Sequence, residues 1–249
     1  MNTPSPITFK DHGDYRMMCS ANDAVMMGLM NVRAPNELIG EYPMAMMAGL
    51  IFRNVADYPA MHAMQLGLGP GSLTKYCWGR LGMHVTAVEL DPAVERACRD
   101  SFGLPPDGER LRVVLADAAD EIARAQYRES VDLLHVDVFD GEAMQPALDH
   151  PGFWRDCCNA LTEQGCMTVN LWGRDPSYSL YDTVDRMATV FGKASIWLLR
   201  LSNAPNTVVL ARRNPMPVDL SELMQQACVV HLLNGVPAHQ FLMQMECPL

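Results

Sequence analysis

The sequence predicts an α/β fold, with a doubly wound, mostly parallel sheet and a small β region at the N-terminus. Two observations support this. From residue 63 onwards, short apolar segments alternate with helical patterns, which is typical of a parallel sheet covered on both faces. The first 36 residues instead hold short apolar segments between turn-like clusters, a pattern that favours short strands joined by turns.

Length and charge limit the possible organisation and partners. A chain of 249 residues can form one large domain or one domain with a small appendage. We divide it into an N-terminal β appendage at 1–36, too short to bury its own core, and a main domain at 37–249. The formal net charge of -10 disfavours a nucleic-acid partner and makes a small cationic substrate easier to accommodate.

The spacing of the metal-binding residue types predicts no metal site. The eight cysteines contain no C-x-x-C pair, and the seven histidines are scattered, so we expect reduced thiols and no metal. The N-terminus lacks the apolar core of a signal peptide, and the longest apolar run, residues 44–51, is too short to cross a bilayer. We therefore expect a cytoplasmic protein without a membrane partner.

The first half of the chain has clear element patterns. Strands are expected in the segments ITF, YRMMC and AVMMGLMNV. A helix is expected over residues 36–56, with Pro43 in its first turn, and residues 57–59 break it. The first strand of the main domain, AMQL, then runs directly into a glycine-rich turn.

This turn, GLGPG, contains Gly67, Gly69 and Gly71 and carries the first functional signal. Glycine lets the backbone turn tightly and approach a ligand, and the helix that follows would point free N–H groups at that ligand. Glu89 ends the next strand, VTAVEL, where doubly wound sheets place the acid that binds a ribose. These four residues predict a nucleoside site, of dinucleotide or S-adenosyl type, although a strand-to-helix connection without a ligand is the structural alternative.

The alternation continues to the C-terminus. Helices are expected at residues 93–102, in a short stretch to about 126, and at 153–161, 178–191 and 220–233. Strands are expected at residues 110–117, 131–136, 166–172, 195–199 and 207–211. Turns are expected at residues 163–165 and 203–206. The last two strands, joined by a tight turn, must be antiparallel. This C-terminal antiparallel hairpin favours a class I methyltransferase-like Rossmann fold over a nicotinamide-binding one.

Four acids fall at the carboxyl ends of expected strands: Glu89, Asp117, Asp137 and Asp140. Ligands of open α/β sheets bind at this edge. Glu89 could bind the ribose hydroxyls and Asp117 the adenine amino group. Asp137 and Asp140 remain, and two carboxylates beside a sulfonium suit an amine substrate, which is protonated at pH 7 and must lose a proton to attack carbon.

Several of these residues also have a structural interpretation. Asp117 could cap a helix, and Asp140 could belong to a turn with Gly141. His135 lies within an expected buried strand, where a hydrogen-bonded core histidine is the more frequent case. Tyr42 could anchor the start of a helix or belong to the site.

Taken together, the motifs LGLGPG, VTAVELDPAV, LRVVLADAADEI and VDLLHVDVFDGE, with EYPMAMM upstream, resemble the spermidine synthase (polyamine aminopropyltransferase) family, especially its shorter bacterial spermidine-synthase-like members. The resemblance covers about residues 14–211. It implies a methyltransferase-like domain with a small N-terminal β region, commonly dimeric. It also implies transfer of an aminopropyl group from decarboxylated S-adenosylmethionine to a small amine such as putrescine.

The resemblance also implies roles for individual residues. Asp137 matches the catalytic acid that orients and deprotonates the amine, and Asp140 matches the second carboxylate of the amine pocket. Glu89 matches the ribose ligand and Asp117 the acid that contacts adenine. Tyr42, in the segment EYPMAMM, is assigned to the amine-binding side.

The chain departs from the family pattern at several positions. Pro70 replaces an aspartate of the glycine loop that could hold the aminopropyl ammonium and repel the carboxylate of S-adenosylmethionine. Met27 replaces an expected glutamine, Pro43 and Met44 replace polar residues, and P-T-Y-P-S-G has no counterpart near residues 203–207. Three hypotheses therefore remain: an aminopropyltransferase, an S-adenosylmethionine-dependent methyltransferase, and a nucleoside-binding protein without catalysis.

Overall fold

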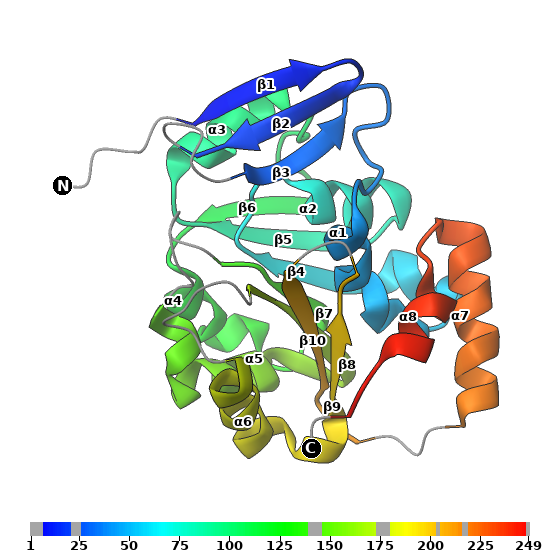
Figure 1. The fold of residues 1–249 in the computed structure, drawn as a ribbon. Helices are drawn as coiled ribbons and strands as arrows, with labels where there is room; N and C mark the ends of the chain where they lie inside the picture. Colours follow the sequence, from blue (N-terminus) through cyan, green and yellow to red (C-terminus); the bar gives the residue numbers. More distant parts are fainter. Residues whose placement is uncertain are drawn as a thin grey trace.

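A computed structural model describes residues 7–20, 26–138, 146–172, 180–202, 205–215 and 219–247. Its N-terminal part is a three-stranded antiparallel sheet of β1 (Thr8–His12), β2 (Tyr15–Cys19) and β3 (Met26–Asn31), in that order. This sheet lies at one end of the molecule, above the edge of a larger sheet (Figure 1). The expected small N-terminal β region is therefore confirmed.

The larger sheet has seven strands in the order β6-β5-β4-β7-β8-β10-β9. Their bounds are β4 (His62–Leu66), β5 (His84–Glu89), β6 (Leu111–Leu115), β7 (Val131–Val136), β8 (Leu161–Trp172), β9 (Ile196–Arg200) and β10 (Asn206–Arg212). The first five strands in this order pair in parallel, and β10 pairs antiparallel to both β8 and β9. The expected doubly wound sheet with a C-terminal antiparallel hairpin is confirmed.

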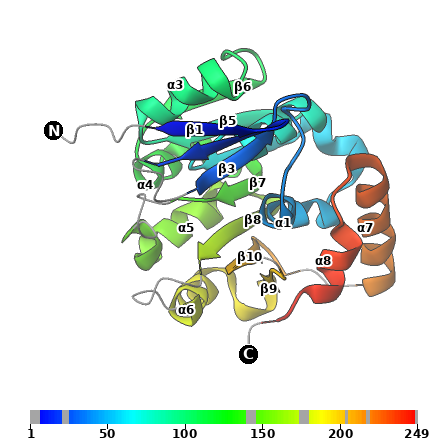
Figure 2. The same ribbon diagram turned by 45° about the horizontal axis from the view of Figure 1, so that its top comes forward.

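Helices cover both faces of this sheet (Figures 1 and 2). The α-helices are α1 (Glu41–Ala45), α2 (Ser72–Lys75), α3 (Pro92–Ser101), α4 (Ala118–Ile122), α5 (Pro151–Ala160), α6 (Leu180–Phe191), α7 (Leu220–Asn234) and α8 (Ala238–Gln244). One apolar cluster joins α2, α3, α7 and α8 to one face and to the N-terminal sheet, and a second joins α4, α5 and α6 to the other face. The sheet is thus buried on both faces between two apolar layers.

Three sequence predictions on local structure were wrong, two of them before β4. The helix expected over residues 36–56 is α only in α1, and a 3-10 helix, η2 (Met46–Phe52), follows. Gly49, in the middle of η2, is a poor helix former, and it packs so closely on β8 that a Cβ there would lie 2.3 Å from Sγ of Cys166. The expected break at residues 57–59 lies inside another 3-10 helix, η3 (Val55–Ala60).

The turn expected at residues 163–165 was also wrong, because these residues lie inside β8. The pairing with β7 is irregular there: Val131 faces Leu161, but Leu133 already faces Cys166. Extra residues of β8 therefore bulge out of the ladder, and a sequence with turn character can stay within a strand in this way. The bulge also sets which residues of β8 stand beside the end of β7.

Candidate active site

The glycine loop connects β4 to α2 at the carboxyl edge of the sheet. Gly67, Gly69 and Gly71 have φ angles of 86°, 52° and 69°, which residues with a Cβ adopt only with strain. At Gly67 there is also no room for a side chain, because a Cβ there would lie 2.1 Å from the backbone oxygen of Asp137. The loop therefore needs glycine both for its conformation and for its close approach to the end of β7.

Glu89 lies beside this loop, as the spacing predicted. Its two carboxylate oxygens each accept a backbone N–H at 2.9 Å, one from Leu68 in the glycine loop and one from Asp91. Burial raises the pKa of the Glu89 carboxyl, and these backbone N–H donors oppose that shift. The loop and the acid thus lie side by side at the carboxyl edge of the sheet, and ribose binding by Glu89 stays a prediction.

Asp117 stands at the end of β6, where its carboxylate caps α4. Its Oδ1 accepts the N–H groups of Ala119 at 2.8 Å and Asp120 at 3.3 Å. The capping role considered from the sequence is therefore present. The side chain is exposed, and its contact with adenine stays a prediction.

Asp137 follows β7 directly and is held from two sides. Its Oδ1 accepts Nδ2 of Asn170 at 2.8 Å, and its Oδ2 accepts the hydroxyl of Tyr42 at 3.3 Å. Burial raises the pKa of the Asp137 carboxyl, and the two hydrogen bonds work against this. Burial and the neighbouring Asp137 also raise the pKa of Tyr42. The structure thus brings Tyr42, 95 residues away in the chain, onto the proposed catalytic acid.

Sequence reasoning missed two asparagines of this site. Asn170, in β8, binds Asp137, and its own Oδ1 accepts Nδ2 of Asn206 at 2.8 Å. Asn170 is almost fully buried. The available signal was an amide in the middle of the apolar strand CMTVNLW, because buried polar side chains need partners.

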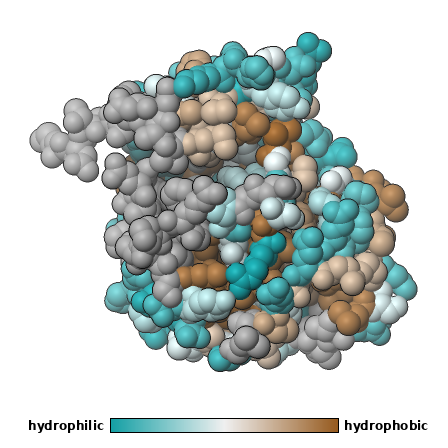
Figure 3. Space-filling view, in the orientation of Figure 1, coloured by the Kyte–Doolittle hydropathy of each residue, from teal (hydrophilic) through white to brown (hydrophobic). Residues whose placement is uncertain are grey.

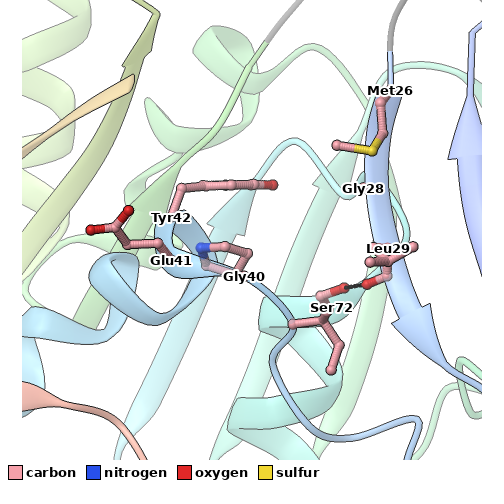
Figure 4. A pocket seen from close by; sticks show the side chains of 9 residues that line it. Met26, Gly28, Leu29, Gly40, Glu41, Tyr42 and Ser72 are labelled. Atoms are coloured by element: carbon pink, nitrogen blue, oxygen red, sulfur yellow. Dashed lines mark hydrogen bonds between the residues drawn. The ribbon is translucent and has the colours of Figure 1, made fainter. Parts of the chain in front are cut away.

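A pocket of about 290 Å³ lies beside Tyr42, between β3 and the segment that enters α1. Its lining residues are Met26, Gly28, Leu29, Ile39, Gly40, Glu41, Tyr42, Pro43 and Ser72. In Figure 4 the hydroxyl end of Tyr42, which contacts Asp137, points toward β3, whereas Glu41 points the opposite way. Asp140, the other predicted carboxylate of the amine side, lies outside the described residues.

The departures from the family pattern gather between this pocket and the glycine loop. Gly28 of β3 packs on Pro70 so closely that a Cβ at Gly28 would lie 2.5 Å from Cγ of Pro70. A Cβ at Gly69 would lie 3.4 Å from the backbone oxygen of Met27. β3 therefore lies directly on the glycine loop, and apolar groups occupy the positions where the family pattern has polar ones.

Other candidate residues have structural roles. His135 is buried, its Nδ1 lies 2.9 Å from the hydroxyl of Thr168, and burial lowers its pKa to about 4, as expected for a core histidine.

Among the residues that the structure describes, no cluster of three histidine, cysteine or acidic side chains could hold a metal ion. Within the same ranges, no helix has both the length and the apolar character needed to cross a membrane.

Comparisons with known proteins fit this geometry. No protein-family model matches the chain. A polyamine aminopropyltransferase of Neisseria meningitidis serogroup A is 31% identical over 237 residues, which cover 95% of this chain and 87% of that protein.

Two solved structures share the fold. A probable spermidine synthase from Corynebacterium glutamicum has a TM-score of 0.72 and 19% identity, covering 94% of this chain and 86% of that one. Human Methyltransferase-like protein 13, in complex with SAH, has a TM-score of 0.66 and 24% identity, covering 82% and 93%. These likenesses confirm the methyltransferase-like Rossmann fold.

Proposed function

The chain belongs to the polyamine aminopropyltransferase family, and we propose on this premise that it transfers an aminopropyl group from decarboxylated S-adenosylmethionine to a small amine such as putrescine. The glycines Gly67, Gly69 and Gly71 would approach the donor, and Glu89 would bind its ribose. Asp117 would contact adenine. The glycine loop and the Glu89 carboxylate beside it support this placement.

The acceptor would bind where Tyr42 meets Asp137, with Asp140 as the second carboxylate. At neutral pH the amine arrives as an ammonium ion, and Asp137 takes one of its protons. The nitrogen lone pair then forms a bond to the carbon next to sulfur, and the carbon–sulfur bond breaks with its electrons going to sulfur. The products are the aminopropylated amine as its ammonium ion, protonated Asp137 and a neutral thioether nucleoside, so charge and protons balance.

One observation carries this proposal: Asp137 is a partly buried carboxylate at the strand end, held by an amide and a phenol, and has no ion-pair partner among the described residues. A raised pKa brings a carboxylate closer to the range that suits a general base near neutral pH. The acceptor ammonium would supply the missing positive charge. The same carboxylate would then orient the amine and accept its proton.

The test is the variant Asp137→Asn, assayed for aminopropyl transfer by mass spectrometry and for donor binding by calorimetry. We expect donor affinity within about threefold of wild type and a loss of turnover of about 100-fold or more, the usual contribution of a general base. Asp120→Asn, an exposed position on α4, is the control for loss of one carboxylate. Unchanged turnover in the Asp137→Asn variant would rule out the assignment.

Pro70 supports a second candidate, methyl transfer from S-adenosylmethionine. The acid that would repel the carboxylate of this donor is absent, and Gly28 packs on the Pro70 ring instead. Calorimetric titration with each donor separates the two candidates: a preference of tenfold or more for the decarboxylated form, about 1.4 kcal/mol, favours aminopropyl transfer. Equal or reversed affinity with a methylated product favours the second candidate, and binding without any product favours a non-catalytic nucleoside-binding protein.

We further propose a cytoplasmic homodimer, with the chain divided into the β appendage 1–36 and the main domain 37–249. All eight cysteines are free thiols, which suits a reducing compartment. Apolar side chains of α7 and α8 are exposed, with Leu232 at 79% and Met243 at 74%, and brown surface lies along this side in Figure 3. Light scattering of wild type and of Leu232→Glu tests whether this surface holds two copies together.

A further inference from the structure

Three side chains from adjacent strands form a line of hydrogen bonds that ends on Asp137. Asn206 donates to Asn170, and Asn170 donates to Oδ1 of Asp137. The register of the sheet explains why these three side chains lie side by side. Val136 faces Val169, so Asn170 stands beside Asp137, while Asn206 faces Trp172 and lies diagonally from Asn170 across the antiparallel pair.

We infer that Asn206 is a positioning residue: by holding the carbonyl of Asn170, it directs the Asn170 amide N–H to Oδ1 of Asp137 and leaves Oδ2 as the oxygen that accepts the proton of the acceptor amine. This inference rests on the proposed transfer to an amine. Asn206 belongs to the segment where the family pattern P-T-Y-P-S-G has no counterpart. In this chain, the same segment reaches the catalytic acid through an amide.

The chemistry of the amide explains why Asn206 matters. An asparagine side chain has an acceptor oxygen on one side and donor N–H groups on the other. If Asn170 turned over, its carbonyl oxygen would face the Asp137 carboxylate, and two acceptors would oppose each other. That arrangement would destabilise the ionised acid. The N–H of Asn206 favours the observed orientation, because the Asn170 carbonyl is its acceptor.

The two oxygens of Asp137 are held unequally. The bond from Asn170 to Oδ1 is 2.8 Å long, whereas the bond from Tyr42 to Oδ2 is 3.3 Å and therefore weaker. Tyr42 is the titratable group that faces Asp137 among the described residues, and it also lines the pocket. Oδ2 is thus the oxygen on the Tyr42 side, and in the proposed reaction an ammonium ion would replace the Tyr42 hydroxyl there.

The experiment uses Asn206→Leu and Asn206→Asp. Leucine removes the donor without adding a charge, and aspartate replaces the donor with an acceptor that attracts the Asn170 N–H. The pKa of the Asp137 carboxyl is measured by ¹³C NMR on protein labelled at the aspartate carboxyl carbon, with Asp137→Asn identifying the resonance. This measurement needs no turnover, so it stands even if the proposed transfer reaction fails.

We expect the Asp137 pKa to rise in both variants, by on the order of one pH unit for Asn206→Asp and less for Asn206→Leu. If transfer is observed, kcat/KM on the acidic side should fall about tenfold per unit of that shift. Asn159→Asp, an exposed site on α5, controls for an added charge. A folded Asn206→Leu protein with an unshifted Asp137 pKa overturns the inference, even if its melting temperature falls, because a merely structural asparagine would behave in that way.

Discussion

Two aspartates at opposite ends of β7 have opposite surroundings. Asp132, near the start of the strand, forms an ion pair with Arg53 at 3.0 Å and accepts further bonds from the His62 N–H and the Thr162 hydroxyl, both at 3.0 Å. Asp137, just past the end of the strand, has an amide and a phenol as partners. No ion pair of Asp137 occurs among the residues described by the structure.

This difference supports the proposal that Asp132 is a structural acid and Asp137 a reactive one. The charge of Asp132 is neutralised within the protein, and its contacts join η2, β4 and β8 at the amino edge of the sheet. Asp137 lies partly buried without a counter-ion among the described residues, so its ionised form costs stability. A cationic ligand such as an amine would remove that cost when it binds at the carboxyl edge of the sheet. At the amino edge, Arg53 already pairs with Asp132.

The largest expected effect comes from disrupting the carboxyl edge with Gly67→Ala. The new methyl group would lie 2.1 Å from the Asp137 backbone oxygen at a φ of 86°, so strain and overpacking should together cost at least about 3 kcal/mol. Gly192→Ala is the matched control, because its φ is 79° and a Cβ there meets nothing within 4 Å. Urea denaturation should show a cost of about 1 kcal/mol for the control, and equal costs would contradict the assigned contact.

The second test breaks the amino edge with Asp132→Asn. Loss of this carboxylate leaves Arg53, which is only 11% exposed, without its counter-ion, and we expect a loss of about 3 kcal/mol in the free energy of unfolding. The folded fraction should still bind the donor as wild type does, because Asp132 lies at the other edge. Donor affinity reduced tenfold at a temperature where the variant is folded would show that the two edges are coupled.

The elements that meet at the carboxyl edge of the sheet could be predicted from the sequence better than the side-chain contacts between them. The segment VDLLHVD is a short, mostly apolar run that ends at an acid, so Asp137 could be placed after a strand, and the glycine loop and Glu89 followed from spacing. Asn170 and Asn206 could not be placed, because they lie 33 and 69 residues beyond Asp137 in the chain. Their position depends on the bulge in β8, where the sequence has turn character, and a shift of one residue would turn Asn170 to the other face.

A third, smaller effect concerns pH. Burial raises the pKa of Asp137 above its unfolded value, so between these two values the native state binds more protons than the unfolded state, and stability falls as pH rises through that window. Asp137→Asn removes this loss of stability. The free energy of unfolding of the variant should therefore rise relative to wild type by about 1.4 kcal/mol for each unit by which the folded pKa of Asp137 exceeds the unfolded one.

Urea denaturation at several pH values measures this gain. It should appear as pH rises and reach a plateau above the folded pKa of Asp137, and it should vanish below the unfolded pKa. Asp120→Asn again controls for the loss of one carboxylate. A gain that is constant across the pH range would show that Asp137 carries no ionisation penalty in the folded protein.

The smallest effect is expected for Tyr42→Phe, which removes only the long bond to Oδ2. The hydroxyl stabilises the ionised acid, so its loss should raise the pKa of Asp137 and move the acidic side of the kcat/KM profile to higher pH. Because the bond is 3.3 Å long, we expect a change of less than about 1 kcal/mol in stability and roughly a few-fold change in kcat/KM. A loss of 100-fold or more would mean that the hydroxyl itself takes part in proton transfer.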